Sequence, residues 1–192
     1  GLYRLETRLR LASQPAAEWS PRGDMRHFLG VGDVWVVTGQ SNSAGYGRGP
    51  YEDPPELLVH AFSNAEEWAL ASHPLNESTD TKHPVNREGA NPGHSPYLQF
   101  GRLLSRQLGY PIGLVATCGL PTPIWLPLPP ACLTRGATAA LGGSPLTAWD
   151  PTDGSEAGLY DNMVSCVAAA GVLKPKGVLW YQVPRTELGA EL

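Results

Sequence analysis

The sequence predicts an α/β protein with a parallel sheet that helices cover on both faces. Three apolar runs, at residues 34–38, 111–116 and 177–181, have the composition of strands buried on both faces. Two segments with helical signals, at residues 95–109 and 157–171, alternate with these runs. Strands and helices that alternate along a chain are typical of parallel sheets.

Size and composition are those of a globular domain. The chain has 192 residues, of which 42% are hydrophobic and 17% charged. Its net charge of -4 provides no basic surface, so we expect no nucleic-acid partner. No apolar run approaches the roughly 20 residues of a membrane-spanning helix. Cys118, Cys132 and Cys166 form no CxxC pair and no even set, which leaves the redox compartment open. Asn76-Glu77-Ser78 matches the N-glycosylation triplet, which matters only in a secreted protein.

Residues 3–11 alternate between two kinds of side chain. Tyr3, Leu5, Thr7, Leu9 and Leu11 would face one way, and Arg4, Glu6, Arg8 and Arg10 the other. This alternation is typical of a half-exposed antiparallel strand. We interpret residues 1–30 as the tail of a β-rich module or as a strand that flanks the main sheet. Because the chain begins with Gly rather than Met, we expect it to be part of a longer protein.

A serine follows directly after the first buried run. Residues 34–38 lead into Gly39-Gln40-Ser41-Asn42, and open α/β sheets hold their ligands at the carboxyl ends of their strands. Gly39 would allow a tight turn and leave room beside Ser41. The pattern predicts a serine hydrolase, although an isolated Gly-x-Ser is more often an ordinary turn. Position 43 is Ser rather than Gly, which argues against the α/β-hydrolase fold.

The next segment is mostly irregular, with a short strand expected at residues 57–62. Ser95 and Pro96 then supply the N-cap and first position of a helix that Gly109 ends. His94, just before this helix, is either an exposed loop residue, the commoner case, or part of a substrate cleft. His73, Asp80 and His83 match no familiar metal-ligand spacing, so we expect a solvated loop and no metal.

Residues 118–139 interrupt the alternation of strands and helices. Their prolines forbid both a helix and a central strand. Without them, residues 115–117 would run into 140–144, a strand followed by a Gly-Gly turn. We interpret this segment as an insertion, either a surface loop or sequence foreign to the domain, such as a retained intron.

Three strand ends now carry groups suited to acyl transfer. Ser41 follows the first strand, Gly142-Gly143 follows the second once the insertion is discounted, and Gln182 ends the third. Parallel strands would bring all three to one edge of the sheet. Backbone N–H groups beside Ser41 and in the Gly turn, with the Gln182 amide, could donate to an oxyanion. The spacing identifies no general base.

These residues resemble the motifs of the sialate O-acetylesterase-like branch of the SGNH hydrolases. Residues 34–42 are similar to its first motif and residues 142–149 to its glycine block. Residues 159–163 and 177–182 are similar to the stretch that leads into its third motif. The resemblance covers residues 31–117 and 140–182, in the order that the family has.

The resemblance implies a three-layer α/β/α sandwich with a flavodoxin-like parallel sheet, incomplete here, over residues 31–182. It implies a serine esterase that removes O-acetyl groups from carbohydrate, with no metal and no organic cofactor. Ser41 would be the nucleophile, and Ser41, Gly143 and Gln182 would form the oxyanion hole. Asn42, His94 and Trp149 are candidates for contacts with a small-molecule or glycan acetyl ester. The resemblance favours an extracellular or secretory location and leaves the oligomeric state open.

The chain departs from the family after its last motif. Val183-Pro184-Arg185 follows Gln182, where the family continues with Gly-Glu-Ser. The family's base lies further on, in an Asp-x-x-His motif, whereas this chain has no His after His94 and no Asp after Asp161. We therefore expect residues 183–192 to be an aberrant tail. The alternative function is a catalytically inactive fragment that at most binds carbohydrate.

Overall fold

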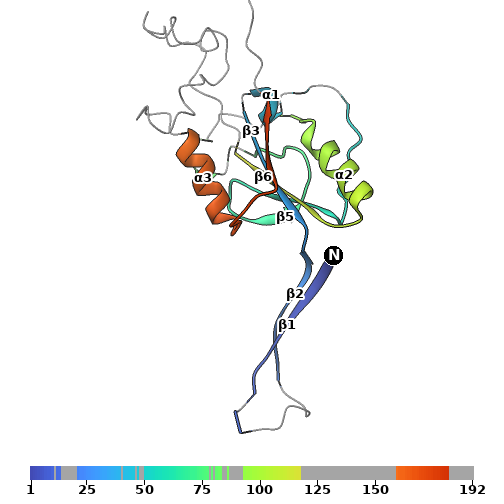
Figure 1. Cartoon of the computed structure of the whole chain (residues 1–192), viewed down its shortest axis with the longest axis vertical. Coiled ribbons are helices and arrows are strands. Elements are labelled where there is room, and N and C mark those ends of the chain that lie inside the picture. The colour runs from blue at the N-terminus through green and yellow to red at the C-terminus, as the bar shows by residue number, and fades with distance from the viewer. Residues whose placement is uncertain are drawn as a thin grey trace, which may run out of the picture.

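Two sheets and three helices make up the described part of the chain (Figure 1). The computed structural model describes residues 1–10, 12–13, 21–39, 41–45, 47, 50–77, 79, 81–83, 86, 93–117 and 159–181. The elements are β1 (Leu2–Arg8), β2 (Arg22–Gly30), β3 (Asp33–Gly39), α1 (Ser41–Ala44), β4 (Val59–Phe62), β5 (Trp68–Leu70), α2 (Tyr97–Leu108), β6 (Ile112–Ala116), α3 (Leu159–Ala169) and β7 (Gly177–Tyr181).

The larger sheet has the strand order β5-β4-β6-β3-β7. β4, β6, β3 and β7 are parallel to their neighbours, as predicted, but β5 runs antiparallel to β4. The sheet is therefore mixed, and the prediction of a wholly parallel sheet was wrong. The reason is local: the Ser63 N–H donates to the Glu67 carbonyl at 2.9 Å, so the chain reverses directly after β4. A connection this short can join only antiparallel strands.

The two longer helices pack on opposite faces of this sheet (Figure 1). Leu98 of α2 belongs to a buried cluster with Leu114 of β6, whereas Cys166 of α3 belongs to a second cluster with Val115. Because adjacent residues of a strand point to opposite faces, α2 and α3 cover different faces. The prediction of an α/β fold is thereby confirmed.

The start of α2 differs from the sequence prediction. Pro96, with φ -69° and ψ -13°, is the N-cap residue, and no side chain caps the helix. The hydroxyl of Ser95 is buried and has no hydrogen-bond partner among the described residues, so the predicted Ser95 cap was wrong. The other end is as expected: Gly109 has a left-handed φ of 73°, and its N–H donates to the Ser105 carbonyl at 2.8 Å.

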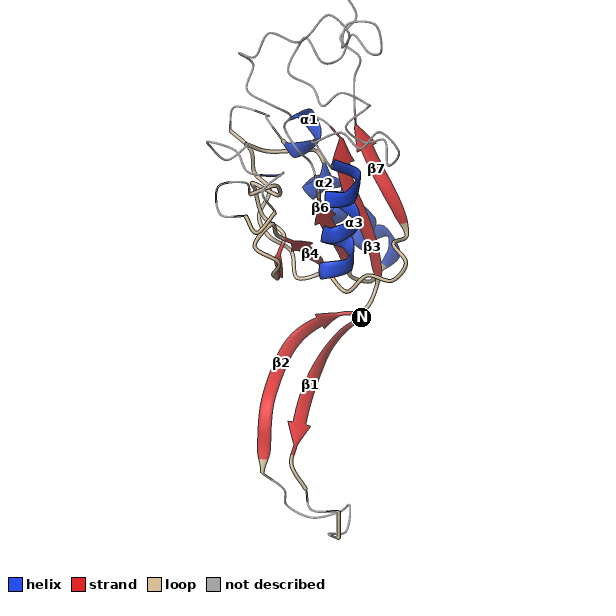
Figure 2. Cartoon of the chain, turned by 90° about the vertical axis from the view of Figure 1, so that its left-hand side faces the viewer, coloured by secondary structure: helices blue, strands red, loops and turns tan. Residues whose placement is uncertain are grey.

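The first two strands form a hairpin that projects from the larger sheet (Figure 2). The prediction of an antiparallel strand in this segment is confirmed by β1, but its apolar side is not covered, because Tyr3 and Leu5 are 59% and 54% exposed. β2 is exposed along its whole length and had no alternating pattern that could predict it. At the root of the hairpin, the Val31 N–H donates to the Gly1 carbonyl at 2.9 Å.

β7 forms one edge of the larger sheet as described. It was predicted to be buried, but Val178 and Trp180 are 50% and 44% exposed. The expectation of a strand buried on both faces was therefore wrong for β7. The apolar composition of an edge strand resembles that of a central one, and the difference appears only once the strand order is known.

A chain of buried asparagines joins the β4–β5 turn and the irregular segment after β5 to α3. Asn64 donates to Asn76 at 3.2 Å, Asn86 donates to Asn64 at 2.7 Å, and Asn162 donates to Asn86 at 2.8 Å. All four side chains are buried, with Asn76 only 1% exposed. The glycosylation triplet at Asn76 is thus inaccessible in the folded chain.

Candidate active site

The predicted serine turn lies at the carboxyl end of β3, between β6 and β7. α1 begins at Ser41, directly beyond this strand end (Figure 1). Gly39 has a φ of 125°, and a Cβ at this position would overlap the carbonyl oxygen of Tyr181 in β7. Glycine is therefore required here both by conformation and by space.

Hydrogen bonds fix α1 against β3 and the start of α2. The Ser43 hydroxyl donates to the Thr38 carbonyl at 2.6 Å and also hydrogen-bonds the Tyr97 hydroxyl at 3.1 Å. Ser43 and Ala44 are both 1% exposed. A helix of four residues has little stability of its own, so these contacts hold the turn in place.

His94 lies beside the segment that follows α1. Its backbone pairs with that of Gly47 in an antiparallel bridge, with N–H···O distances of 3.0 and 3.4 Å. A Cβ on Gly45 would come within 2.9 Å of the Ser95 Cβ, so residues 94–95 also pack closely against position 45. His94 is partly buried, and its Nδ1 has no hydrogen-bond partner among the described residues. The commoner expectation, an exposed loop histidine, was wrong.

The rings of Tyr51, His73 and His94 pack together next to the Gly47–His94 bridge. The Tyr51 ring lies 4.7 Å from the His94 ring, tilted by 47°, and 4.9 Å from the His73 ring, nearly perpendicular at 79°. The two imidazoles are 5.9 Å apart. Tyr51 is 48% exposed, whereas the side chain of His73 is fully buried.

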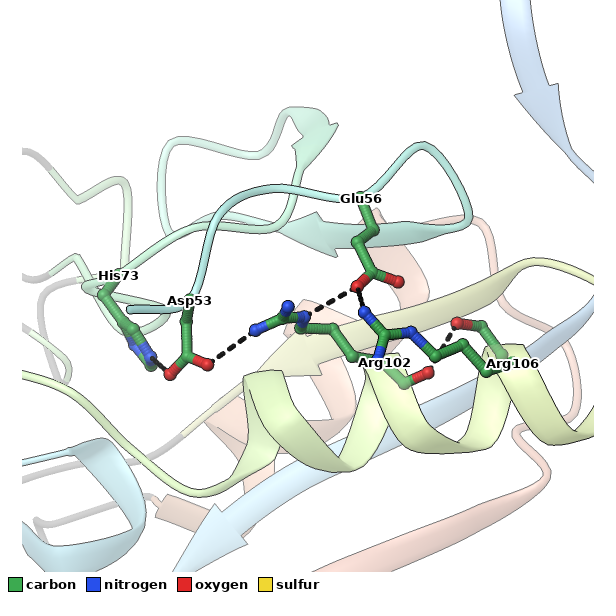
Figure 3. A network of polar contacts seen from close by, with 6 residues as sticks. Asp53, Glu56, His73, Arg102 and Arg106 are labelled. Atoms are coloured by element: carbon green, nitrogen blue, oxygen red, sulfur yellow. Dashed lines mark hydrogen bonds and ion pairs between the residues drawn. The ribbon is translucent and has the colours of Figure 1, made fainter. Parts of the chain in front are cut away.

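A charged network supports these rings from α2 (Figure 3). Arg102 of α2 donates to Asp53 at 2.7 Å, and Asp53 lies 3.3 Å from Nε2 of His73. Arg102 also donates to Glu56 at 2.8 Å, and Arg106 reaches the same carboxylate. The hydrogen bond from Arg102 lowers the pKa of Glu56, and in return the Glu56 carboxylate raises the pKa of Arg102.

Burial lowers the pKa of His73, and the nearby Asp53 carboxylate only partly opposes this effect. The expected solvated loop is wrong for His73 and also for His83, whose side chain is 11% exposed and lies 3.4 Å from Glu66. Asp80 lies outside the described residues. Among the residues that the structure describes, no three His, Cys, Asp or Glu side chains are grouped to hold a metal ion.

Sequence reasoning did not single out the Arg102 network, although the sequence held a signal for it. Arg102 and Arg106 are four residues apart on a predicted helix and so share one face. Asp53 and Glu56 flank two prolines, which stiffen the segment between them. The pairing of these two segments depends on the tertiary fold and was therefore not visible in the spacing.

The other predicted site residues are described in part or not at all. For Ser41 and Asn42 the structure describes the backbone, which forms the first turn of α1. Gly143, Trp149 and Gln182 lie outside the described residues. Gln182 is next in sequence to Tyr181, which pairs with Gly39.

A cavity of about 570 Å³ lies away from the serine turn. Its lining includes Gly32 and Asp33 at the start of β3 and Ile112 at the start of β6. These residues are at the amino ends of the strands, whereas ligands of open α/β sheets bind at the carboxyl ends. We therefore assign the candidate active site to the serine turn.

The fold and this turn define an α/β protein with a serine at the carboxyl edge of its sheet. A model of the family described as "Carbohydrate esterase, sialic acid-specific acetylesterase" matches residues 31–127, just over half of the chain. The chain therefore belongs to this carbohydrate esterase family.

A solved structure of a protein from Arabidopsis thaliana has a similar fold, with a TM-score of 0.51 and 23% sequence identity. The similarity covers 78% of this chain and 56% of that one, so the chain spans little more than half the length of this relative. No curated protein matched the sequence. None of the helices in the described ranges is long and apolar enough to cross a membrane.

Proposed function

We propose that this chain carries the serine esterase site of a carbohydrate acetylesterase, with Ser41 as the nucleophile. The observation that carries the proposal is the position of Ser41, at the start of α1 and directly beyond the Gly39 turn. The family to which the chain belongs supports the reaction class. The same proposal includes an incomplete domain of the three-layer α/β/α, SGNH-hydrolase type over residues 31–182.

In the proposed reaction, the Ser41 hydroxyl attacks the acetyl carbonyl of the substrate. The oxyanion receives hydrogen bonds from the backbone N–H groups of Ser41 and Gly143 and from the Gln182 amide. Collapse of the tetrahedral intermediate releases the sugar hydroxyl and leaves acetyl-Ser41, which water then hydrolyses. The pairing of β3 with β7 supports a common site for Ser41 and Gln182. Tyr181, which precedes Gln182, pairs with Gly39, two residues before Ser41.

The proposed domain organisation follows the same interpretation. Residues 1–30 belong to a β-rich module or flank the sheet, residues 118–139 are an insertion, and residues 183–192 are an aberrant tail. The exposed hairpin supports the first assignment, because a two-stranded hairpin has little stability alone and usually packs on further strands.

Hydrolysis of p-nitrophenyl acetate by the chain and by its Ser41→Ala variant tests the proposed function. Ser63→Ala is a matched control, because Ser63 takes part in the β4–β5 turn through its backbone. We expect turnover that Ser41→Ala abolishes and Ser63→Ala keeps. Equal background rates from folded samples would instead support the alternative, an inactive fragment that lacks the Asp-x-x-His base.

A further inference from the structure

Tyr51 presents an aromatic ring beside the candidate active site. The ring is 48% exposed, although it contacts the rings of both His73 and His94. His94 in turn is bridged to Gly47, three residues after α1 ends. The ring therefore lies on the same side of the molecule as the Ser41 turn, connected to it through directly contacting residues.

The support beneath this ring is unusually well fixed for a surface tyrosine. His73 is fully buried and held by Asp53, and Asp53 is held by Arg102 of α2 at 2.7 Å. Burying the Asp53–Arg102 pair costs desolvation free energy. Apolar side chains could hold Tyr51 near α2 without that cost. Such a support does restrict the motion of an exposed ring, which lowers the entropy cost of binding a ligand to that ring.

The chemistry around Tyr51 suits an amphipathic ligand. The ring gives an apolar face with a phenolic hydroxyl at its end, and the Asp53 carboxylate, two residues along the chain, is 20% exposed and paired with Arg102. A pyranose ring has the complementary form, with C–H groups on its faces and hydroxyl groups around its rim.

We propose that Tyr51 is the stacking platform for the sugar ring of the acetylated substrate. This proposal rests on the proposed esterase function, in which the sugar is the alcohol released from the acetyl group. His73 and His94 hold the ring through their contacts with it, and Asp53 and Arg102 position His73. Tyr51 thus contributes to sugar affinity rather than to the chemical step.

The experiment compares Tyr51→Leu and Tyr51→Phe with wild type. Tyr3→Leu is the matched control, because Tyr3 is 59% exposed on the hairpin, away from the serine turn. Binding is measured by NMR titration with an O-acetylated sialic acid and with O-acetylated glucose, and turnover with p-nitrophenyl acetate, which has no sugar. Leu keeps an apolar side chain but removes the ring, and Phe keeps the ring.

We expect Tyr51→Leu to weaken sugar binding about tenfold, as the loss of an aromatic stacking contact does in other sites. Tyr51→Phe and Tyr3→Leu should bind within about twofold of wild type, and Tyr3→Leu should keep the wild-type p-nitrophenyl acetate rate. Unchanged binding by Tyr51→Leu, or no sugar binding by wild type, would overturn the platform. A parallel loss of binding and p-nitrophenyl acetate turnover in Tyr51→Leu would also overturn it, by showing a structural role. Absence of p-nitrophenyl acetate turnover in wild type counts against the esterase function alone, because the titration needs no turnover.

Discussion

Gly39 sets the geometry of the serine turn at the scale of a single residue. Its φ of 125° is unfavourable for any residue with a side chain, and a Cβ would overlap the Tyr181 carbonyl oxygen. From the sequence motif we predicted that Gly39 allows the tight turn before Ser41. The motif could not predict the second reason, the close approach of β7, because that contact joins residues far apart in the chain.

Gly39→Ala should therefore lower the free energy of unfolding by about 3 kcal/mol or more. Gly109→Ala is the matched control, because Gly109 also has a positive φ, but a Cβ there would have no atom within 4 Å. We expect the control to cost only about 1 kcal/mol. Urea unfolding measures both variants, and equal losses would contradict the role of the Tyr181 contact.

Asn86 is the central member of the buried asparagine chain. It accepts a hydrogen bond from Asn162 and donates one to Asn64. Asn86→Ala should cost about 2–4 kcal/mol, because both partners would be left buried without it. Ser72→Ala, at an exposed residue of the same segment, should have little effect. Thermal unfolding compares the two variants, and a loss below about 1 kcal/mol for Asn86→Ala would show that water replaces the lost amide.

At the scale of elements, long apolar runs and the helix that ends at Gly109 were predictable, and short or exposed strands were not. The strands β3, β6 and β7 and the helix α2 were expected within one or two residues of their bounds. β5 has only three residues, all exposed, and β2 carries charges on both faces, so neither has a periodic pattern. Both strands exist because a neighbouring strand provides hydrogen bonds.

α2 is tied to the segment before β4 by Arg102, whose hydrogen bond lowers the pKa of Glu56. A carboxylate whose pKa is lower in the folded state than its unfolded value of 4.5 stabilises the fold at any pH above 4.5. This stabilisation is lost as the pH falls through the pKa of the folded state. Wild type should thus become less stable between about pH 5 and pH 3. Glu56→Gln and Arg102→Met should both reduce this acid dependence, which chemical unfolding at a series of pH values measures. Slopes identical to wild type would show that other carboxylates cause the acid loss.

At the candidate site, the sequence predicted the contacts between residues close in the chain but not those between distant segments. The place of Ser41 followed from the strand and glycine before it. The contacts of Tyr51, His73 and His94 bring together three separate segments, so no spacing in the sequence predicted them. The roles of Gly143, Trp149 and Gln182 stay predictions, because these residues lie outside the described ranges.

At the scale of the whole molecule, stability resides in the larger sheet and not in the hairpin. Leu114, at the centre of β6, is 1% exposed, whereas Leu5 of β1 is 54% exposed. Leu114→Ala should cost about 2–5 kcal/mol through the lost contacts and the cavity it leaves. Leu5→Ala should change the free energy of unfolding by no more than about 0.5 kcal/mol. Urea unfolding of both variants checks this, and a large loss for Leu5→Ala would mean that the hairpin apolar face is covered in solution.

The hairpin and the serine turn lie at opposite ends of β3. The hairpin root at Val31 is just before this strand, and Ser41 is just after it. Seven residues of extended chain span about 20 Å. A resin, surface or fused reporter attached through Gly1 would therefore face away from the serine turn. Attachment at this end offers a way to immobilise the domain on a solid support while substrate reaches Ser41 from the free side.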